Sequence, residues 1–176
     1  MKIKVLVFGS VFVLVSMAFT PSSRADDNER LGDKPTGIGV VLGEPTGFTL
    51  KEWIAPRQAI DLGLAFSFDN YVSVYSDYLF HFPEAFGNST AFLRSLQPYV
   101  GIGGELFLSG NSNRAKTEYY NSPGSSVGFA IRIPLGAECL VPGAPIGVFA
   151  ELVPGVGIVP GTFSFLQGGV GARYYF

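Results

Sequence analysis

The sequence is short of charge and of cysteine. Only 15% of its 176 residues are charged, while 47% are hydrophobic, whereas an ordinary soluble domain carries about 25% charged residues. The single Cys excludes an intrachain disulfide framework. The 16 Phe and 8 Tyr residues exclude a disordered chain, because disorder goes with few aromatics and high charge. The length suits one domain.

Long hydrophobic runs are also scarce. One uncharged run, over residues 5–19, follows a basic N-terminus and precedes the small residues Ser23 and Ala25. The run is shorter than the roughly 20 residues that cross a bilayer, so it predicts a secretory signal peptide over 1–25. Without this segment the chain has nine basic and 14 acidic residues, and this balance gives no support to nucleic-acid binding.

Apolar residues alternate with small or polar residues through the rest of the chain. Such period-two alternation is typical of strands with two different faces. Short turns rich in Gly, Pro and Asn join most of the segments and indicate an antiparallel meander. The pattern predicts eight strands, at 36–43, 46–54, 58–68, 71–82, 97–108, 125–138, 145–153 and 163–176.

Two architectures fit eight such strands: a soluble lipocalin-like barrel and an outer-membrane barrel. The second face distinguishes them, because it consists mainly of glycine with about one charge per strand. A water-facing surface would carry many Lys, Glu and Thr residues, whereas a narrow eight-stranded interior favours small residues between a few large ones. The sequence therefore predicts an all-β fold: an eight-stranded antiparallel up-and-down transmembrane β-barrel over 36–176, preceded by a short periplasmic segment over 26–35.

The charges on the inner row are the candidate functional residues. An unpaired charge inside the barrel would be costly, so we expect a salt-bridge network with Arg132 and Arg173 as hubs. Its function is either a selectivity filter or gate, or a plug that holds the barrel together, and the narrow interior favours the plug. The predicted network comprises Lys51, Asp61, Asp77, Glu105, Arg132, Glu151 and Arg173, with Glu138 near a strand end as a further candidate.

The last strand carries a family resemblance. Val170, Ala172 and Tyr174 alternate toward the terminal aromatic residue Phe176. With the signal peptide and the alternating strands, this ending resembles the small bacterial outer-membrane barrels that include the OmpA transmembrane domain and OmpX. The resemblance implies a location in the outer membrane, contact with its lipid, and recognition of these four residues by the barrel-assembly machinery. We expect a monomer.

An even number of strands ending in the periplasm places both termini there and the links after odd-numbered strands outside. The longest polar link, 109–125, is then extracellular. Its tyrosines among Ser, Asn and Gly resemble an adaptable binding surface, and a solvated loop without a partner is the alternative. The residues predicted to form this surface are Arg114, Lys116, Glu118, Tyr119 and Tyr120.

The periplasmic ends of the strands hold three further features. The single His, His81, is predicted at the interface and lacks the Ser and acid of lipid-modifying enzymes, so we expect neither an enzyme nor a cofactor or metal. Trp53 is predicted in an aromatic girdle if a bulge turns it outward, because strict alternation would place it inside. The link over 83–95 is long for a periplasmic turn and predicts either a small cap with Phe86 and Phe92 or a different strand count.

These expectations combine into a function for the chain. The sequence predicts an outer-membrane barrel with a closed, salt-bridged interior that acts as a structural or surface-interaction protein, for adhesion or for binding an extracellular ligand. The alternative is a narrow pore for ions or small solutes.

Overall fold

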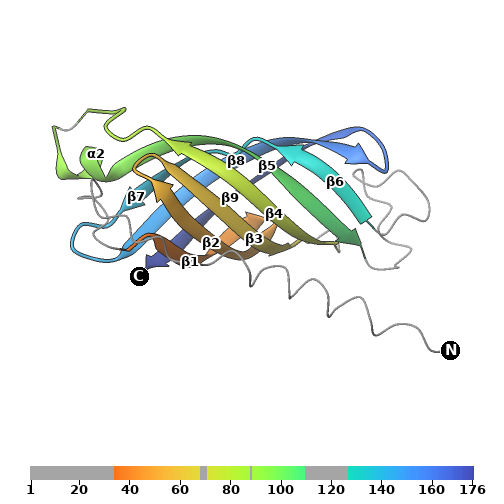
Figure 1. Ribbon diagram of the computed structural model, residues 1–176, viewed down its shortest axis with the longest axis horizontal. Coiled ribbons are helices and arrows are strands. Elements are labelled where there is room, and N and C mark those ends of the chain that lie inside the picture. Colours follow the sequence, from red (N-terminus) through yellow and green to blue (C-terminus); the bar gives the residue numbers. More distant parts are fainter. Residues whose placement is uncertain (1–33, 68–70, 88, 110–126) are drawn as a thin grey trace.

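The computed structural model describes residues 34–67, 71–87, 89–109 and 127–176, and strands make up most of this part (Figure 1). The predicted signal peptide and the five predicted surface residues between 114 and 120 lie outside the described residues. In the part that is described, no helix is both long and apolar enough to cross a membrane. The strands are β1 (Thr36–Glu44), β2 (Thr46–Ala55), β3 (Gln58–Phe66), β4 (Tyr71–His81), β5 (Leu96–Ser109), β6 (Val127–Arg132), β7 (Leu135–Leu140), β8 (Ile146–Val159) and β9 (Phe163–Tyr175).

The strands form a closed antiparallel ring in which β1 pairs with β9 and β4 with β5. β6 and β7 share one position, because both pair with β5 on one side and with β8 on the other. Pro134, which has no N–H to donate, lies between these two halves. The ring therefore has eight positions, and closure leaves no open sheet edge. The predicted eight-stranded up-and-down barrel is confirmed.

One strand is longer than the sequence pattern predicts. β8 continues to Val159, whereas residues 154–162 were expected to form a link. Gly155 and Gly157 interrupt the apolar pattern there, but they pair with Phe165 and Phe163 of β9. A Cβ atom at either glycine would lie 2.1 Å from the facing phenylalanine ring. The glycines thus mark places where inward aromatic rings cover the strand, and they do not end it.

The two faces of the ring differ in composition. Large apolar side chains point outward along each strand, and Leu166, Ile102 and Phe48 are at least 60% exposed. On β6 the exposed Val127, Phe129 and Ile131 alternate with inward residues. Exposed apolar surface of this extent marks an interaction with lipid or with another protein.

Inward glycines make room for the large interior side chains. Gly63 on β3 faces Tyr75 on β4, and a Cβ atom at Gly63 would lie 2.0 Å from the tyrosine ring. Gly39 on β1 likewise faces Arg173 on β9, where a Cβ atom would come within 2.8 Å of the arginine side chain. The inward glycines, which we call the glycine row, therefore leave space for the aromatic rings and guanidinium groups of the neighbouring strands.

The link between β4 and β5 contains a short helix, α2 (Ala91–Ser95), whose N-cap Thr90 accepts a hydrogen bond from the backbone N–H of Leu93. Phe86 and Phe92 of this link are exposed. Of the two expectations for this segment, a small cap or a different strand count, the structure favours the first, because its described residues hold a short helix and no strand between β4 and β5. α2 and the C-terminus lie at the same end of the barrel (Figure 1).

Candidate functional site

The seven inward charges predicted from the sequence all point into the barrel. Glu151 is half-buried, and the other six are at most 2% exposed. Glu138, which the sequence placed near a strand end, is equally buried and lies among them. The described interior thus holds three basic side chains and five carboxyl groups, and all of them except Glu151 form two clusters.

Arg173 on β9 is the centre of the first cluster. Its Nη2 atom lies 2.6 Å from Oδ2 of Asp61, and its Nη1 atom lies 3.7 Å from Oε1 of Glu138. Nε and Nη2 also donate to Oγ1 of Thr49, at 3.3 Å and 3.1 Å. Beneath the guanidinium lies the Phe149 ring, 3.7 Å from the guanidinium carbon to the ring centroid. One arginine therefore connects strands that are not neighbours in the ring.

Lys51 on β2 extends this cluster. Its Nζ atom forms a salt bridge with Oε2 of Glu138 and lies 2.8 Å from Nε2 of His81. The other oxygen of Glu138 accepts a hydrogen bond of 2.5 Å from the Tyr175 hydroxyl. Glu138 is therefore held by two cations and a phenol, so its carboxylate is paired although it is buried.

Two expectations about the same end of the barrel are wrong. His81 is not an interfacial surface residue, because it is fully buried and lies between the Trp53 and Tyr99 rings, with centroids 4.3 Å and 5.0 Å away. Trp53 does not join an outer girdle, because it follows strict alternation and is only 6% exposed. The register shift lies between Trp53 and Ala55, too late to turn the indole outward. Lys51 Nζ lies 4.4 Å from the indole centroid, a cation–π contact that favours the inward position.

Arg132 on β6 is the centre of the second cluster. Its Nε atom lies 3.3 Å from Oδ1 of Asp77, and its Nη1 atom lies 3.3 Å from Oε2 of Glu105. The other Glu105 oxygen accepts a hydrogen bond of 3.1 Å from Nε2 of Gln167. The Tyr75 ring centroid lies 4.0 Å from the guanidinium carbon. This cluster joins β4, β5, β6 and β9 across the interior.

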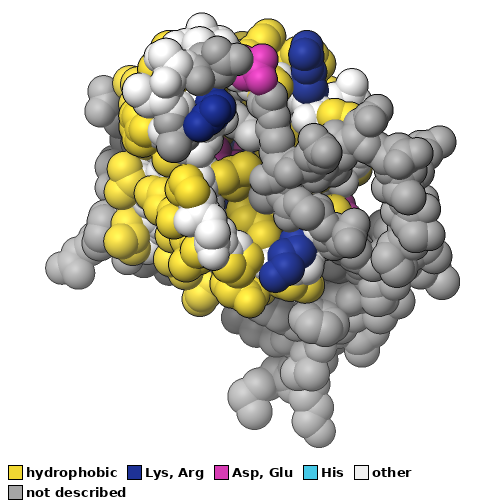
Figure 2. Space-filling view, turned by 90° about the vertical axis from the view of Figure 1, so that its left-hand side faces the viewer, with side chains coloured by type: hydrophobic (Ala, Val, Ile, Leu, Met, Phe, Trp, Pro, Cys, Tyr) yellow, Lys and Arg dark blue, Asp and Glu magenta, His cyan; other side chains and the backbone are white. Residues whose placement is uncertain are grey.

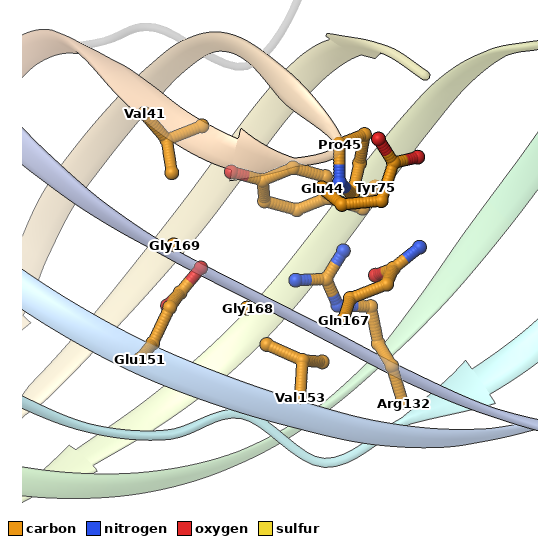
Figure 3. A pocket seen from close by; sticks show the side chains of 10 residues that line it. All are labelled: Val41, Glu44, Pro45, Tyr75, Arg132, Glu151, Val153, Gln167, Gly168 and Gly169. Carbon is orange, nitrogen blue, oxygen red and sulfur yellow. The ribbon is translucent and has the colours of Figure 1, made fainter. Parts of the chain in front are cut away.

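Glu151 lies between the two clusters and departs from the predicted network. No Lys or Arg among the described residues lies within salt-bridge distance of it, and its Oε2 atom instead accepts a hydrogen bond of 2.9 Å from the Tyr99 hydroxyl. The two arginines are already held by other carboxyl groups. In Figure 3, Glu151, Arg132 and Gln167 face Tyr75 across a small pocket. The centre of a water molecule could lie anywhere within about 10 Å³ of this pocket. That is close to the space that one water needs.

An aromatic layer that the sequence analysis did not single out lies at the opposite end from α2. Phe107 packs edge-on against Phe165, with ring centroids 5.7 Å apart, and Tyr71 packs against Phe107 at 5.3 Å. Phe163 lies beside both phenylalanines. Phe107 lies two residues after the inward Glu105, so alternation along β5 carried a signal for this layer. Together with the two ionic clusters, these rings fill much of the described interior.

The four residues of the predicted assembly signal lie on the outer face of β9 and at its end. Val170, Ala172, Tyr174 and Phe176 are all exposed, while Arg173 and Tyr175 between them point inward. The described residues contain no group of three or more His, Cys, Asp or Glu side chains arranged to hold a metal ion.

The geometry can be compared with known proteins. The crystal structure of the N-terminal β-barrel domain of Pseudomonas aeruginosa OprF is similar to this chain, with a TM-score of 0.57. The match covers 80% of this chain and 96% of the OprF domain, at 18% sequence identity. The fold is that of the OmpA-like β-barrels. At this identity the likeness concerns the fold alone. No family model matches the sequence, and no curated protein matches it in sequence.

Proposed function

We propose that the chain is an outer-membrane β-barrel with a closed interior that acts as a structural or surface-interaction protein. The observation that carries the proposal is the inverted distribution of side chains: large apolar residues point outward, and ion pairs fill the inside. This distribution suits lipid outside and a packed polar interior. The likeness to the OprF barrel domain supports the same fold.

The orientation of the barrel is part of the proposal. The start of β1 pairs with the end of β9, for example Gly37 with Tyr175, so the barrel begins and ends at one rim. We place this rim in the periplasm, because both termini of even-stranded barrels lie there. The polar link over 109–125 is then outside the cell, where we propose that it contacts an extracellular ligand.

Two further parts of the proposal concern partners and chemistry. The outward row of β9 that ends at Phe176 supports recognition by the barrel-assembly machinery during insertion. The position of His81 supports a role other than catalysis, because its Nε2 atom faces Lys51 inside the barrel and a catalytic triad needs a nucleophile at that place.

A narrow pore is the alternative function. The pocket beside Glu151 and Arg132 favours it, because Glu44, Tyr75 and Gln167 add further polar groups to its lining. The narrow eight-stranded interior argues against a pore, because the side chains that line this pocket leave room for about one water molecule.

Folding in detergent tests the membrane assignment. The purified chain without residues 1–25 is refolded from urea in detergent and analysed by gel electrophoresis with and without boiling. We expect a fast-migrating folded band that boiling converts to a slower one, and precipitation when detergent is omitted. A chain that folds and stays monomeric in plain buffer would refute the proposal.

Shortening the polar link tests the surface role. Residues 110–124 are replaced by a short Gly-Ser-Asn linker, and binding of the two proteins to intact cells or to extracellular matrix proteins is compared. We expect unchanged folding and lost binding. Loss of the folded band would contradict a display role, because the loop would then be needed for the barrel itself.

A further inference from the structure

The exposed basic side chains of the described residues gather at one rim of the barrel. Three of the described Lys and Arg residues are buried in the interior clusters. The others, Lys34, Arg57 and Arg94, are exposed. Figure 2 looks at this rim and shows separate basic side chains set among apolar ones. This arrangement contrasts with the chain as a whole, in which acidic residues outnumber basic ones.

Three separate segments bring these charges to the same end. Lys34 lies two residues before the start of β1, and its Nζ atom lies 6.0 Å from the Tyr174 ring centroid near the end of β9. Arg57 lies in the turn between β2 and β3, where its carbonyl accepts a hydrogen bond of 2.7 Å from the backbone N–H of His81. Arg94 lies in the last turn of α2, in the link that follows β4.

Exposed aromatic side chains accompany the charges. Phe86 and Phe92 belong to the same link as Arg94 and are 55% and 61% exposed. Tyr174 and Phe176 are exposed at the end of β9. Aromatic rings of this kind lie at the level of lipid headgroups in membrane barrels, and basic side chains beside them suit a negatively charged headgroup layer. Of the described acidic residues, only Glu84 is exposed.

We propose that this rim binds the headgroups of anionic phospholipids in the periplasmic leaflet. Lys34, Arg57 and Arg94 contact the phosphate groups, and Phe86 and Phe92 lie at the boundary between headgroups and acyl chains. The charge of the three basic residues is complementary to that of the lipid, and neither exposed arginine carries a salt bridge to a described acidic residue. This inference rests on the proposed membrane insertion and orientation.

Native mass spectrometry tests the inference on the folded protein. The protein is released from nanodiscs that contain phosphatidylglycerol and phosphatidylcholine in equal amounts, and the retained lipids are counted. We expect phosphatidylglycerol to be enriched. We expect the variant K34Q/R57Q/R94Q to lose most of this enrichment, since each basic residue near an anionic surface accounts for about a fivefold preference.

Two control variants separate charge from fold. R57K/R94K keeps the charge and is expected to keep the enrichment, and E84Q removes the exposed acid and is expected not to reduce it. Equal retention of the two lipids by the natural chain, or undiminished enrichment in the triple glutamine variant, would overturn the inference. A chain that does not fold in nanodiscs, as shown by a gel mobility that boiling does not change, overturns the proposed function as well. A folded chain without lipid preference overturns only the proposed binding of anionic headgroups at the rim.

Discussion

Nη2 of Arg173 lies 2.6 Å from Oδ2 of Asp61, and this pair joins β9 to β3 although β2 and β1 separate the two strands in the ring. Both residues are 1% exposed. The ion pair, which we call the strut, therefore links two non-adjacent strands across the interior of the barrel. Removing one partner of such a pair leaves the other charge buried without compensation, and this is far more costly than losing an exposed ion pair.

Substitution of Arg173 by Gln should destabilise the folded barrel by about 3–5 kcal/mol, because Asp61 loses its cation and Glu138 loses one of two. Urea unfolding in zwitterionic detergent, followed by Trp53 fluorescence, measures the change. Arg57→Gln is the control, since Arg57 is exposed and should leave the midpoint unchanged. Equal midpoints for the Arg173 variant and the natural chain would contradict the strut.

Lys51 and Glu138 should be energetically coupled. Lys51→Met alone leaves Glu138 with Arg173 and Tyr175 only, whereas Lys51→Met combined with Glu138→Gln removes both charges of the bridge. We expect the double variant to be more stable than the sum of the single changes implies, by about 0.5–3 kcal/mol. A double-mutant cycle in urea provides the value, and strict additivity would show that the bridge contributes nothing.

The glycine row should not tolerate larger residues. Gly63→Val should destabilise the barrel by about 1–3 kcal/mol, because its Cβ atom would lie 2.0 Å from the Tyr75 ring. Gly63→Val combined with Tyr75→Ala should recover part of the loss. Gly161→Ala is the matched control, since nothing lies within 4 Å of a Cβ atom there. The prediction fails if both glycine substitutions have the same effect on thermal unfolding.

A charged residue on the outer face should destabilise the barrel more when it lies deeper in the bilayer. Ile102 lies near the middle of β5 and is 60% exposed, whereas Val141 lies in the turn between β7 and β8. In lipid vesicles, Ile102→Arg should cost about 2–4 kcal/mol and Val141→Arg about 0–1 kcal/mol. Similar values for the two variants would show that no hydrocarbon surrounds the barrel.

Alternation and glycine content predicted the fold well. Because successive side chains of a strand point to opposite faces, the position of a residue along the strand determines its face. Even the inward position of Trp53 follows from this strict alternation. The end of β8 was missed because Gly155 and Gly157 resemble turn residues, and only the facing rings of Phe165 and Phe163 explain them.

The interior partners could not be predicted in the same way. Alternation places Lys51 inside and makes Glu138 a candidate, but the contacts of both depend on how strands far apart in sequence are staggered. Lys51 meets Glu138 from β7, whereas Glu151, also inward, receives only a phenol. Register around the ring decides such pairings, and a single sequence contains no direct signal for it.

Electrical recording tests the central claim, a membrane barrel whose interior is closed, most directly. The folded chain is incorporated into planar lipid bilayers, and heat-modifiable mobility of the same sample verifies that it is folded. We predict no unitary current steps from the natural chain, because two ionic clusters and an aromatic layer fill its interior. Reproducible steps that a variant such as Arg132→Ala makes larger would contradict the closed barrel and support the narrow pore.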